Sequence, residues 1–501
     1  MVLSAAVTLL AGASWAAQHA VQAADYGGAT GSRLAAVWAV TFVLLLGQTL
    51  MYHAERPARP SPRARRRLNE LHVAVLLPVY NEDEGYLRLA LESMLAQTRL
   101  PDSVHVVDDG SGIRDDERNI VEVIDYAAVR QWWEAATAAS GIATTWHRQP
   151  NAGKRHAQAA GVHASPDADV YITVDSDSCL APTAIEEILL PLARHRVQSV
   201  AGIVLATNHR TNLLTRVTDL WFTTGQLTDR SALSAMGSVL VNSGPLAAYR
   251  AAVIRDNLDS YLNETFRGRP VMFSDDSLLT LYALLRGRTV QQHTAIVFTA
   301  LPERASHFAR MYMRWMRGST IRSLWRLRYL PVTGYAYWAH VTRWFTVALS
   351  TTVLGWLLLV EPLRYGNRPS ATFLVVLLLI GWAQALRYLG VIRSDERIRE
   401  RAVTWLLMPL AVLGSWTVLR AMRWYGMATC ARTGWGTRQD GAEVSLDGVV
   451  NTIVPLPDDD TLQIPRIPVA KLLDPVTETT LTLPIPRPRE AWSPLPEGTP
   501  R

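Results

Sequence analysis

Apolar and polar positions are distributed unevenly along this chain. Long uncharged apolar runs lie near both ends, whereas apolar and polar segments alternate over short distances in the middle. Residues 34–52 form an uncharged run close to the ~20 residues that a helix needs to cross a bilayer. Residues 2–24 are rich in alanine and lack a basic start, so they fit either a second membrane helix or a poor signal peptide. We therefore expect an N-terminal membrane region over residues 1–55.

Further apolar runs follow in the last third of the chain, at residues 344–360, 371–386 and 402–419. Each is near the lower length limit for a spanning helix, and together they predict C-terminal membrane helices within residues 337–425. The third run contains Pro409, which favours a helix that enters the membrane and returns on the same side. Residues 441–501 are rich in Pro, Thr and Asp without sustained periodicity, which predicts a disordered tail.

The middle of the chain, residues 72–300, has the alternation of short apolar runs and helix-like segments that is typical of an α/β domain with a mostly parallel sheet. Buried strands are predicted at residues 73–78, 103–107 and 170–174. Helices are predicted at residues 84–97, 120–139, 154–164 and 182–194. We expect Trp132 and Trp133, in the second of these helices, to pack in the core and not to stack on bases.

Residues 301–332 differ from both the middle domain and the membrane runs. One helical face carries apolar side chains, at Phe308, Met311, Tyr312 and Trp315, and another carries Arg310, Arg314 and Arg317. An apolar stripe beside a cationic one predicts an amphipathic helix that lies flat in the membrane interface.

Charge places the middle domain on the cytosolic side of a multi-pass cell-membrane protein. The net charge is +6, and the cations are almost all arginine, with lysine only at Lys154 and Lys471. Arginines are concentrated in the linker 56–71, directly after the first apolar run, where they mark the cytoplasmic side. The basic residues indicate contact with the lipid bilayer and not with nucleic acid, although a solvated linker is the simpler alternative. Cys179 and Cys430 lack CxxC spacing, so neither a disulfide framework nor a zinc site is indicated.

The strongest chemical signal lies at the end of the predicted strand 170–174. Asp175 and Asp177 follow this strand, and positions i and i+2 of an extended chain project to the same side. Two such carboxylates can bind one Mg²⁺ or Mn²⁺ together with phosphate oxygens, at the sheet edge where open α/β domains bind ligands. A surface turn is the alternative explanation for the pair taken alone.

Polar groups also follow the neighbouring strands. Tyr80 and Glu82 follow the first strand, where an aromatic ring can cover a nucleobase. Asp108 and Asp109 end the second strand before a glycine turn, so they can accept hydrogen bonds from a base or a ribose. Each pair is also compatible with an ordinary strand-to-helix turn.

Lys154 and Arg155 open the predicted helix 154–164. A diphosphate would be attracted both to these cations and to the helix N-terminus, although a solvated helix start is the alternative. The motif Ser243-Gly244-Pro245 can form a tight turn that lets the backbone approach a sugar. The motif Ser274-Asp275-Asp276 precedes a helical pattern, so it can cap that helix or supply the base that deprotonates an acceptor hydroxyl.

Taken together, these motifs resemble those of the processive family-2 glycosyltransferases, especially hyaluronan synthases and their chitin-synthase and nodulation relatives. The resemblance covers roughly residues 73–438. It rests on Val107 to Ser111, Gly153-Lys154-Arg155, Asp175-Ser176-Asp177, Ser243-Gly244-Pro245 with Tyr249-Arg250, Ser274-Asp275-Asp276, Arg314-Trp315 and Trp435-Gly436-Thr437-Arg438. It implies a GT-A fold and an inverting transfer from a UDP-sugar donor to a growing polysaccharide.

The resemblance also implies roles for individual residues on the donor side. Tyr80 and Asp109 would hold the uridine, and Asp177, helped by Asp175, would hold the metal. Within the gating segment 430–440, residues Trp435, Thr437 and Arg438 would close over the diphosphate.

On the acceptor side, Asp276 is similar to the catalytic base, beside Asp275, in the family's acidic triplet. Arg314 and Trp315 match the last two positions of the family's QxxRW motif, which binds the acceptor. This chain has Met311 where that motif has glutamine, and Ser274 where hyaluronan synthases usually have glycine. A methionine side chain cannot make the amide's hydrogen bonds to a sugar.

Topology and function leave alternatives. If Arg438 reaches a cytosolic active site, the chain crosses the membrane an even number of times between Asp276 and Arg438. Two of the three late apolar runs would then span the membrane. The alternative is that all three span. A non-processive enzyme that adds one sugar to a lipid or short acceptor is the second hypothesis, motivated by Met311. A catalytically silent nucleotide-sugar-binding scaffold is the third.

Overall fold

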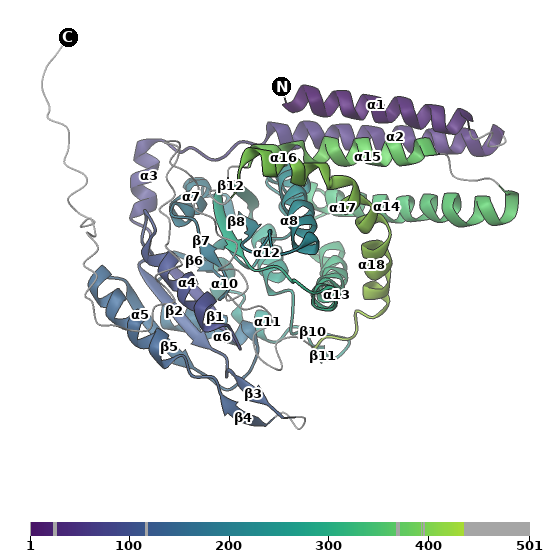
Figure 1. The fold of residues 1–501 in the computed structure, drawn as a ribbon. Helices are drawn as coiled ribbons and strands as arrows, with labels where there is room; N and C mark the ends of the chain where they lie inside the picture. The colour runs from purple at the N-terminus through teal and green to yellow at the C-terminus, as the bar shows by residue number, and fades with distance from the viewer. Residues whose placement is uncertain are drawn as a thin grey trace, which may run out of the picture. The chain divides into compact units, whose positions relative to one another are not determined.

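The computed structural model describes residues 2–23, 28–115, 119–366, 371–391, 393 and 396–434. Its centre is an eight-stranded sheet with strand order β5-β2-β1-β6-β9-β8-β12-β7 (Figure 1). These strands are β1 (Val73–Val79), β2 (Ser103–Asp108), β5 (Ala143–Arg148), β6 (Val170–Thr173), β7 (Cys179–Leu180), β8 (Val197–Ala206), β9 (Ala247–Arg250) and β12 (Arg288–Thr299). Only the pairings of β9 and β7 are antiparallel, so the predicted mixed, mostly parallel sheet is confirmed.

The central strand β1 is buried on both faces, because its sequence VAVLLPV is apolar at every position. Its odd-numbered residues face a core with α4 (Glu84–Leu95), α5 (Ala127–Ser140) and α7 (Ala184–Leu189). Ala74 and Leu76 face a second core with α6 (Lys154–Ala164), α10 (Ala251–Arg255) and α12 (Asp275–Arg286). The domain therefore has helices on both faces of its sheet, as doubly covered α/β domains do.

The predicted helix 120–139 is wrong at its start. Residues Ile120–Val123 form strand β4, which pairs with β3 (Gly112–Arg114), and α5 begins only at Ala127. The sequence Ile-Val-Glu-Val has the β-branched composition of a strand. The packing role of the tryptophans is confirmed, since Trp133 is fully buried and Trp132 lies against the same core.

The predicted helix 182–194 is shorter than expected. Helix α7 ends at Leu189 and continues as the 3₁₀ turn η1 (Leu190–Ala193), in which Pro191 has no N–H to extend the α-helical ladder.

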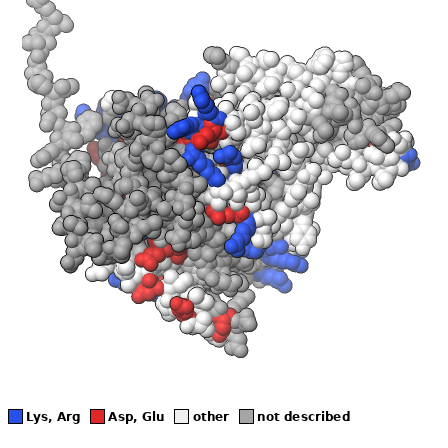
Figure 2. All heavy atoms as spheres, viewed as in Figure 1, with Lys and Arg blue, Asp and Glu red and all other residues white. Residues whose placement is uncertain are grey.

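The N-terminal apolar segments form helices α1 (Val2–Ala23) and α2 (Gly28–Ala54). Helix α1 packs against α2 and against α15 (Ala371–Ala385), with small residues such as Ala13 and Ala16 at the contact (Figure 1). Within the described residues, three helical segments are long and apolar enough to cross a membrane: Leu34–Ala54, Tyr335–Tyr365 and Ile398–Ala428. On the face drawn in Figure 2, the described surface over α1 and α2 carries almost no charged side chains.

The proline-containing run is not one straight helix. It divides into α16 (Ile398–Leu406), α17 (Met408–Trp416) and α18 (Val418–Ala428), with Pro409 in the first turn of α17. The first break falls just before Pro409, whose ring and missing N–H are incompatible with a continuous helix. Whether this segment spans the membrane or re-enters it stays a prediction.

The amphipathic segment forms helix α13 (Ala305–Tyr329), which packs on the α/β domain. Arg322 is fully buried and forms a bidentate ion pair with Glu264, at 2.6 and 3.0 Å. Glu264 also accepts hydrogen bonds from Arg155 at 2.7 Å and from Trp325 at 2.8 Å. This cluster fixes α13 against the loop that precedes α12.

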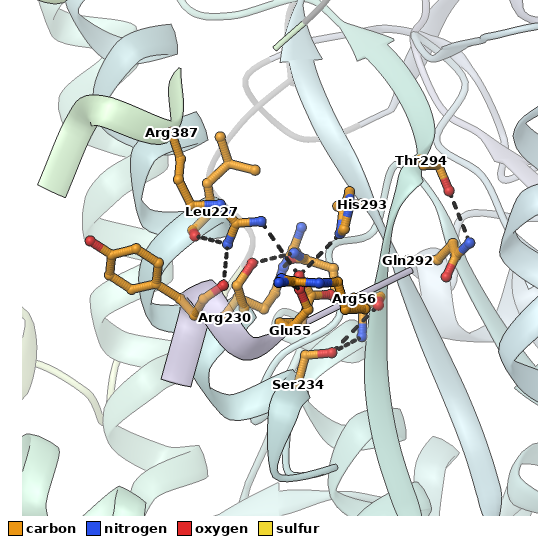
Figure 3. Close-up of polar contacts among 12 residues, drawn as sticks. Glu55, Arg56, Leu227, Arg230, Ser234, Gln292, His293, Thr294 and Arg387 are labelled. Carbon is orange, nitrogen blue, oxygen red and sulfur yellow. Dashed lines mark hydrogen bonds and ion pairs between the residues drawn. The ribbon is translucent and has the colours of Figure 1, made fainter. Parts of the chain in front are cut away.

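A second polar cluster joins the end of α2 to the sheet (Figure 3). The buried Glu55 contacts His293 of β12 at 3.0 Å and Arg387 at 3.5 Å. Arg387, in η4 (Leu386–Gly390) after α15, also donates hydrogen bonds to the carbonyls of Tyr52 at 2.9 Å and Leu227 at 2.7 Å. The cluster therefore connects two apolar helices to the catalytic sheet.

Candidate active site

The carboxyl ends of β1, β2 and β6 open into a cavity of about 1210 Å³. Most of the predicted site residues line this one cavity, although they come from distant parts of the chain. They are Tyr80, Glu82, Asp109, Lys154, Asp175, Asp177, Ser243, Gly244, Pro245, Asp275, Asp276, Arg314 and Trp315.

Two predicted nucleotide-binding residues do not line the cavity. Asp108 is buried and accepts hydrogen bonds from the backbone N–H of Ser111 and from Arg148 at 2.6 Å. Arg155 is buried in its ion pair with Glu264 and also donates to the carbonyl of Phe273. Both side chains are therefore occupied in holding loops, since a buried charge is stable only when it is paired.

Asp109 shapes the loop that carries Lys154. Its carboxylate accepts hydrogen bonds from the backbone N–H groups of Ala152 at 3.0 Å and Gly153 at 2.8 Å, and from Gln149. Burial raises the pKa of Asp109, although these hydrogen bonds oppose the shift. Gly153 has a φ of 97°, a left-handed backbone conformation that glycine adopts without strain, immediately before α6 begins.

Lys154 lies between two of the predicted carboxylates. Its Nζ is 2.6 Å from Asp175 and 3.3 Å from Asp275. Burial opposes the charged form of Lys154, but the two carboxylates outweigh it and raise its pKa. A Cβ at Gly244 would lie 3.1 Å from Asp175 Oδ2 and 3.3 Å from Lys154 Nζ, so the backbone of the Ser243-Gly244-Pro245 turn approaches this pair closely.

Asp275 and Asp276 begin helix α12 and line the same cavity. Burial opposes ionisation of Asp275, but Lys154 and Arg155 outweigh it and lower its pKa. Burial, followed by the negative charge of Asp275, raises the pKa of Asp276 to about 7. Asp276 is therefore suited to exchange a proton near neutral pH.

Ser274 occupies the N-cap position of α12 but does not cap it through its side chain. Its φ of 62° is left-handed, a conformation that glycine adopts more easily than serine. The position is also crowded, since a Cβ at Gly318 of α13 would lie 2.7 Å from the Ser274 Cβ.

The two carboxylates predicted to bind metal fit a cation shared with a diphosphate. Asp175 and Asp177 both line the cavity, and Asp177 also accepts a hydrogen bond from Thr299 at 3.1 Å. In the part of the chain that the structure describes, no group of three His, Cys, Asp or Glu side chains forms a metal-binding cluster. Mg²⁺ typically uses one or two carboxylates plus substrate phosphates, so two carboxylates are a sufficient protein contribution.

Helix α13 forms the wall that faces α12. Trp315 stacks on Phe222, with ring centroids 5.7 Å apart, and Arg314 lines the same cavity. Met311 is buried and also lines the cavity, so a thioether faces the site at the position where a glutamine was expected from the family pattern.

Several residues that contribute to the site were not predicted from the sequence. Arg230 is buried in the π-helix η2 (Gln226–Arg230) and donates a hydrogen bond to Ser243 Oγ at 2.6 Å. Ser176 donates to Glu82 at 2.6 Å. Arg230 belongs to no sequence motif, and Ser176 lies within the Asp175-Ser176-Asp177 motif without an assigned role. Only the fold brings each of them to its partner.

The chain returns to the cavity after α18. Arg432 and Gly434 line it, and the carbonyl of Thr433 accepts a hydrogen bond from the backbone N–H of Met272 at 3.2 Å. The predicted gating residues Trp435, Thr437 and Arg438 begin at the next position and lie outside the described residues.

Two protein-family models match this chain. The family model described as glycosyl transferase family 2 matches residues 74–258, and the model described as glycosyl transferase family group 2 matches residues 171–384. A mannosyltransferase from Pyrobaculum calidifontis, solved with GDP-Man and Mn²⁺, aligns with 17% identity and a TM-score of 0.44 over 86% of this chain and 99% of that one.

Individual relatives are more similar in sequence. A hyaluronan synthase of Streptococcus pyogenes is 33% identical over 401 residues, which cover 79% of this chain and 88% of that protein. An N-acetylglucosaminyltransferase of Sinorhizobium fredii is 29% identical over 371 residues, which cover 73% of this chain and 84% of that protein. On this similarity the chain belongs to the hyaluronan synthase-like group of the family-2 glycosyltransferases.

Proposed function

We propose that this protein is an inverting, processive polysaccharide synthase that uses a UDP-sugar donor and a growing glycan acceptor. The observation that carries the proposal is the position of Asp276 in the same cavity as Lys154, Asp175 and Asp177. A carboxylate with a pKa near neutrality thus faces a cationic and metal-binding wall, which is the arrangement that a sugar transfer needs.

The donor would bind at the carboxyl ends of the central strands. Tyr80 would cover the uracil, and Asp109 and Glu82 would accept hydrogen bonds from the nucleoside. Lys154 would contact the diphosphate from the N-terminus of α6, where the helix dipole also favours negative charge. Trp435, Thr437 and Arg438 would complete the diphosphate site.

Asp175 and Asp177 would hold Mg²⁺ or Mn²⁺ against the diphosphate. When bound, the ion would stabilise negative charge on the departing UDP. Without a donor, Lys154 pairs with Asp175. The donor diphosphate would compete with Asp175 for Lys154, and the metal would compete with Lys154 for Asp175.

The acceptor would approach from the α13 side, over Trp315 and Arg314. Asp276 would remove the proton from the acceptor hydroxyl as that oxygen attacks the anomeric carbon, and the sugar–phosphate bond would break on the opposite side. Lys154 would keep Asp275 ionised. The proton taken from the acceptor hydroxyl would therefore go to Asp276 and not to Asp275.

The catalytic domain would lie in the cytosol, because the arginine-rich linker after α2 marks that side of the membrane. The polymer would leave through the membrane helices, so that synthesis and export are coupled. Partners would be the donor, the glycan acceptor and the lipid bilayer, without nucleic acid.

Purified protein in nanodiscs tests the donor chemistry. A panel of UDP-sugars should reveal at least one donor from which UDP is released only with Mg²⁺ or Mn²⁺. Asp276→Asn and Asp177→Asn should each lower this rate by about 10²-fold or more. The first change removes a general base, whose effect is typically about 10²–10⁴-fold, and the second removes a proposed metal ligand. Asp256→Asn, an exposed acid paired with Arg286 at the surface, is the control. Normal turnover in Asp276→Asn would exclude the mechanism.

The second candidate is a transferase that adds one sugar, and Met311 is the observation that favours it. A methionine in the cavity wall removes the amide that would hold an acceptor sugar. Product length distinguishes the two candidates.

A further inference from the structure

Strand β8 has one edge that no other described strand covers along its second half. Strand β9 pairs with β8 as far as Ala201, and the backbone N–H of Gly202 donates one more hydrogen bond, to the carbonyl of Leu246, at 3.1 Å. The chain before Leu246 is the Ser243-Gly244-Pro245 turn, which belongs to no strand. Because a buried backbone group without a partner is costly, the remaining groups on this edge of β8 need other partners.

The π-helix η2, which follows α8 (Leu213–Gly225), supplies partners for this edge. Gln226 pairs with both backbone groups of Val204, at 2.8 and 2.7 Å, as a neighbouring strand would. Arg230 donates a hydrogen bond to the carbonyl of Gly202 at 2.6 Å. Side chains of η2 therefore replace the missing strand, and π-helical turns of this kind occur frequently at functional sites.

Arg230 does more than cover the sheet edge. Its guanidinium also donates to Ser243 Oγ at 2.6 Å and to the amide oxygens of two glutamines, so all four acceptors are uncharged. Burial lowers the pKa of Arg230 to about 9, and the charges of Asp276 and Glu55 oppose this shift. A buried cation that is surrounded by uncharged acceptors is costly, which points to a role besides sheet packing.

The turn that Arg230 contacts lies directly against the proposed diphosphate and metal site. A Cβ at Gly244 would lie 3.1 Å from Asp175 Oδ2 and 3.3 Å from Lys154 Nζ, so there is little free space between the turn and this pair. A displacement of about 1 Å in an active site can cost about 10²-fold in rate. The position of the turn therefore affects where Lys154 and Asp175 lie.

The residue before the turn is tied to the helix that carries the proposed base. The backbone N–H of Asn242 donates to Thr280 Oγ1 at 3.0 Å, and this hydroxyl donates to the carbonyl of Asp276 at 2.6 Å. The turn thus has two anchors, Arg230 in η2 and Thr280 in α12. Only the Arg230 anchor comes from outside the known motifs of the site.

We propose that Arg230 is a positioning residue, which holds the Ser243-Gly244-Pro245 turn against Lys154 and Asp175 and thereby sets how tightly the donor diphosphate binds. Arg230 lies outside the described residues that line the cavity, so it acts through the turn and not on the reacting atoms. The inference rests on the proposed function, which assigns the diphosphate to Lys154 and the metal to Asp175.

The test measures the binding of UDP with Mn²⁺ to the full-length protein in nanodiscs by calorimetry, together with the KM for a donor that supports turnover. Arg230→Met removes the hydrogen-bond donors, so UDP should bind roughly tenfold more weakly and the KM should rise by a similar factor. Arg230→Lys keeps a cation that can reach Ser243, and its UDP affinity should stay within about threefold of wild type. Ser243→Ala removes the same hydrogen bond, so adding it to Arg230→Met should cause little further loss.

Asp219→Asn is the matched control for a purely structural role. Asp219 covers the same edge of β8, where it accepts a hydrogen bond from the N–H of Ala206 at 2.7 Å, and it pairs with Arg393 at 2.9 Å. It makes no hydrogen bond to the turn in the described structure. Asp219→Asn should therefore lower the unfolding temperature while UDP affinity stays within about twofold of wild type.

Wild-type UDP affinity in Arg230→Met would overturn the inference. Fully additive losses in Arg230→Met and Ser243→Ala would also overturn it, because the two side chains would then act independently. An equal loss of UDP affinity in Asp219→Asn would assign the effect to stability and overturn it as well. If Arg230→Met does not fold, wild-type UDP affinity in Ser243→Ala would have the same meaning. A wild-type protein that binds UDP but releases none from any donor would contradict the proposed function, and the binding comparison would still decide the role of Arg230.

Discussion

At the scale of single residues, Asp276 carries the most specific chemical expectation. Its pKa of about 7 results first from burial and then from the charge of Asp275, both of which disfavour the ionised form. The base must be ionised to accept a proton, so kcat should rise about tenfold per pH unit below pH 7 and level off above it. Measuring UDP release between about pH 5.5 and 8.5 checks this. A flat profile over that range would contradict the assignment of Asp276 as base.

The same shift has a consequence for stability. An acid whose folded pKa is raised is destabilised when it ionises, so the folded state loses stability as pH rises from the unfolded pKa of ~4 towards 7. Asp276→Asn removes that penalty. The variant should unfold at a higher temperature than wild type at pH 8, and the difference should vanish near pH 4. A lower unfolding temperature than wild type at pH 8 would argue against the raised pKa.

Gly244 should tolerate no side chain. A Cβ there would lie 3.1 Å from an oxygen of Asp175 and 3.3 Å from the nitrogen of Lys154, so these side chains would have to shift by a few tenths of an ångström. Because a displacement of about 1 Å in an active site can cost 10²-fold in rate, Gly244→Ala should lower kcat by a smaller factor, roughly tenfold, while the protein stays folded. Gly225→Ala, where a Cβ meets nothing within 4 Å, is the control and should keep wild-type activity.

Ser274 offers the opposite case, in which glycine should improve the protein. A left-handed φ of 62° costs a non-glycine residue roughly 1–2 kcal/mol. Ser274→Gly should stabilise the fold by about 1 kcal/mol in denaturant unfolding, with activity retained. Ser260→Gly, within helix α11 (Leu258–Leu262), should destabilise by about the same amount.

At the scale of elements, the sequence predicted the central strands and the ligand edge well. Helix α6 has the predicted bounds, because its start follows a glycine turn and its apolar positions recur with helical period. The region 120–123 was misassigned because four residues are too few to reveal a period. Asp108 and Arg155 could not be placed, since their partners Arg148 and Glu264 lie 40 and 109 positions away and only the folded chain brings them together.

The Glu55 cluster tests how the N-terminal helix is joined to the catalytic sheet. Glu55 is buried between His293 and Arg387, and removing one partner of a buried ion pair typically costs 3–5 kcal/mol because the other charge is left uncompensated. Glu55→Ala should therefore destabilise the protein by about that amount. Asp256→Ala breaks an exposed pair with Arg286 and should cost about 1 kcal/mol or less. Equal losses of stability in both variants would mean that the Glu55 cluster holds the N-terminal helix no more strongly than an exposed ion pair would.

At the scale of the whole molecule, the return of the chain to the cavity constrains the membrane topology. Arg432 and Gly434 line the same cavity as Asp276. The segment from Asp276 to Arg432 therefore begins and ends at one cavity, on one side of any membrane. Two breaks divide the last apolar segment into α16, α17 and α18. The shared cavity is consistent with the prediction of an even number of crossings after Asp276. Which of the late apolar runs does not cross stays a prediction, since Ile398–Ala428 is long and apolar enough to span.

The extent of the cavity favours polymer synthesis over single addition, because its lining runs from Asp276 to residues of the apolar helices and so leaves room for more than one sugar. The length of the product made by the purified wild-type protein therefore tests the central claim most directly. With the UDP-sugars that support turnover, a gel should resolve a ladder of long polymer that is absent with Asp276→Asn. A single-sugar adduct as the only wild-type product would contradict the account.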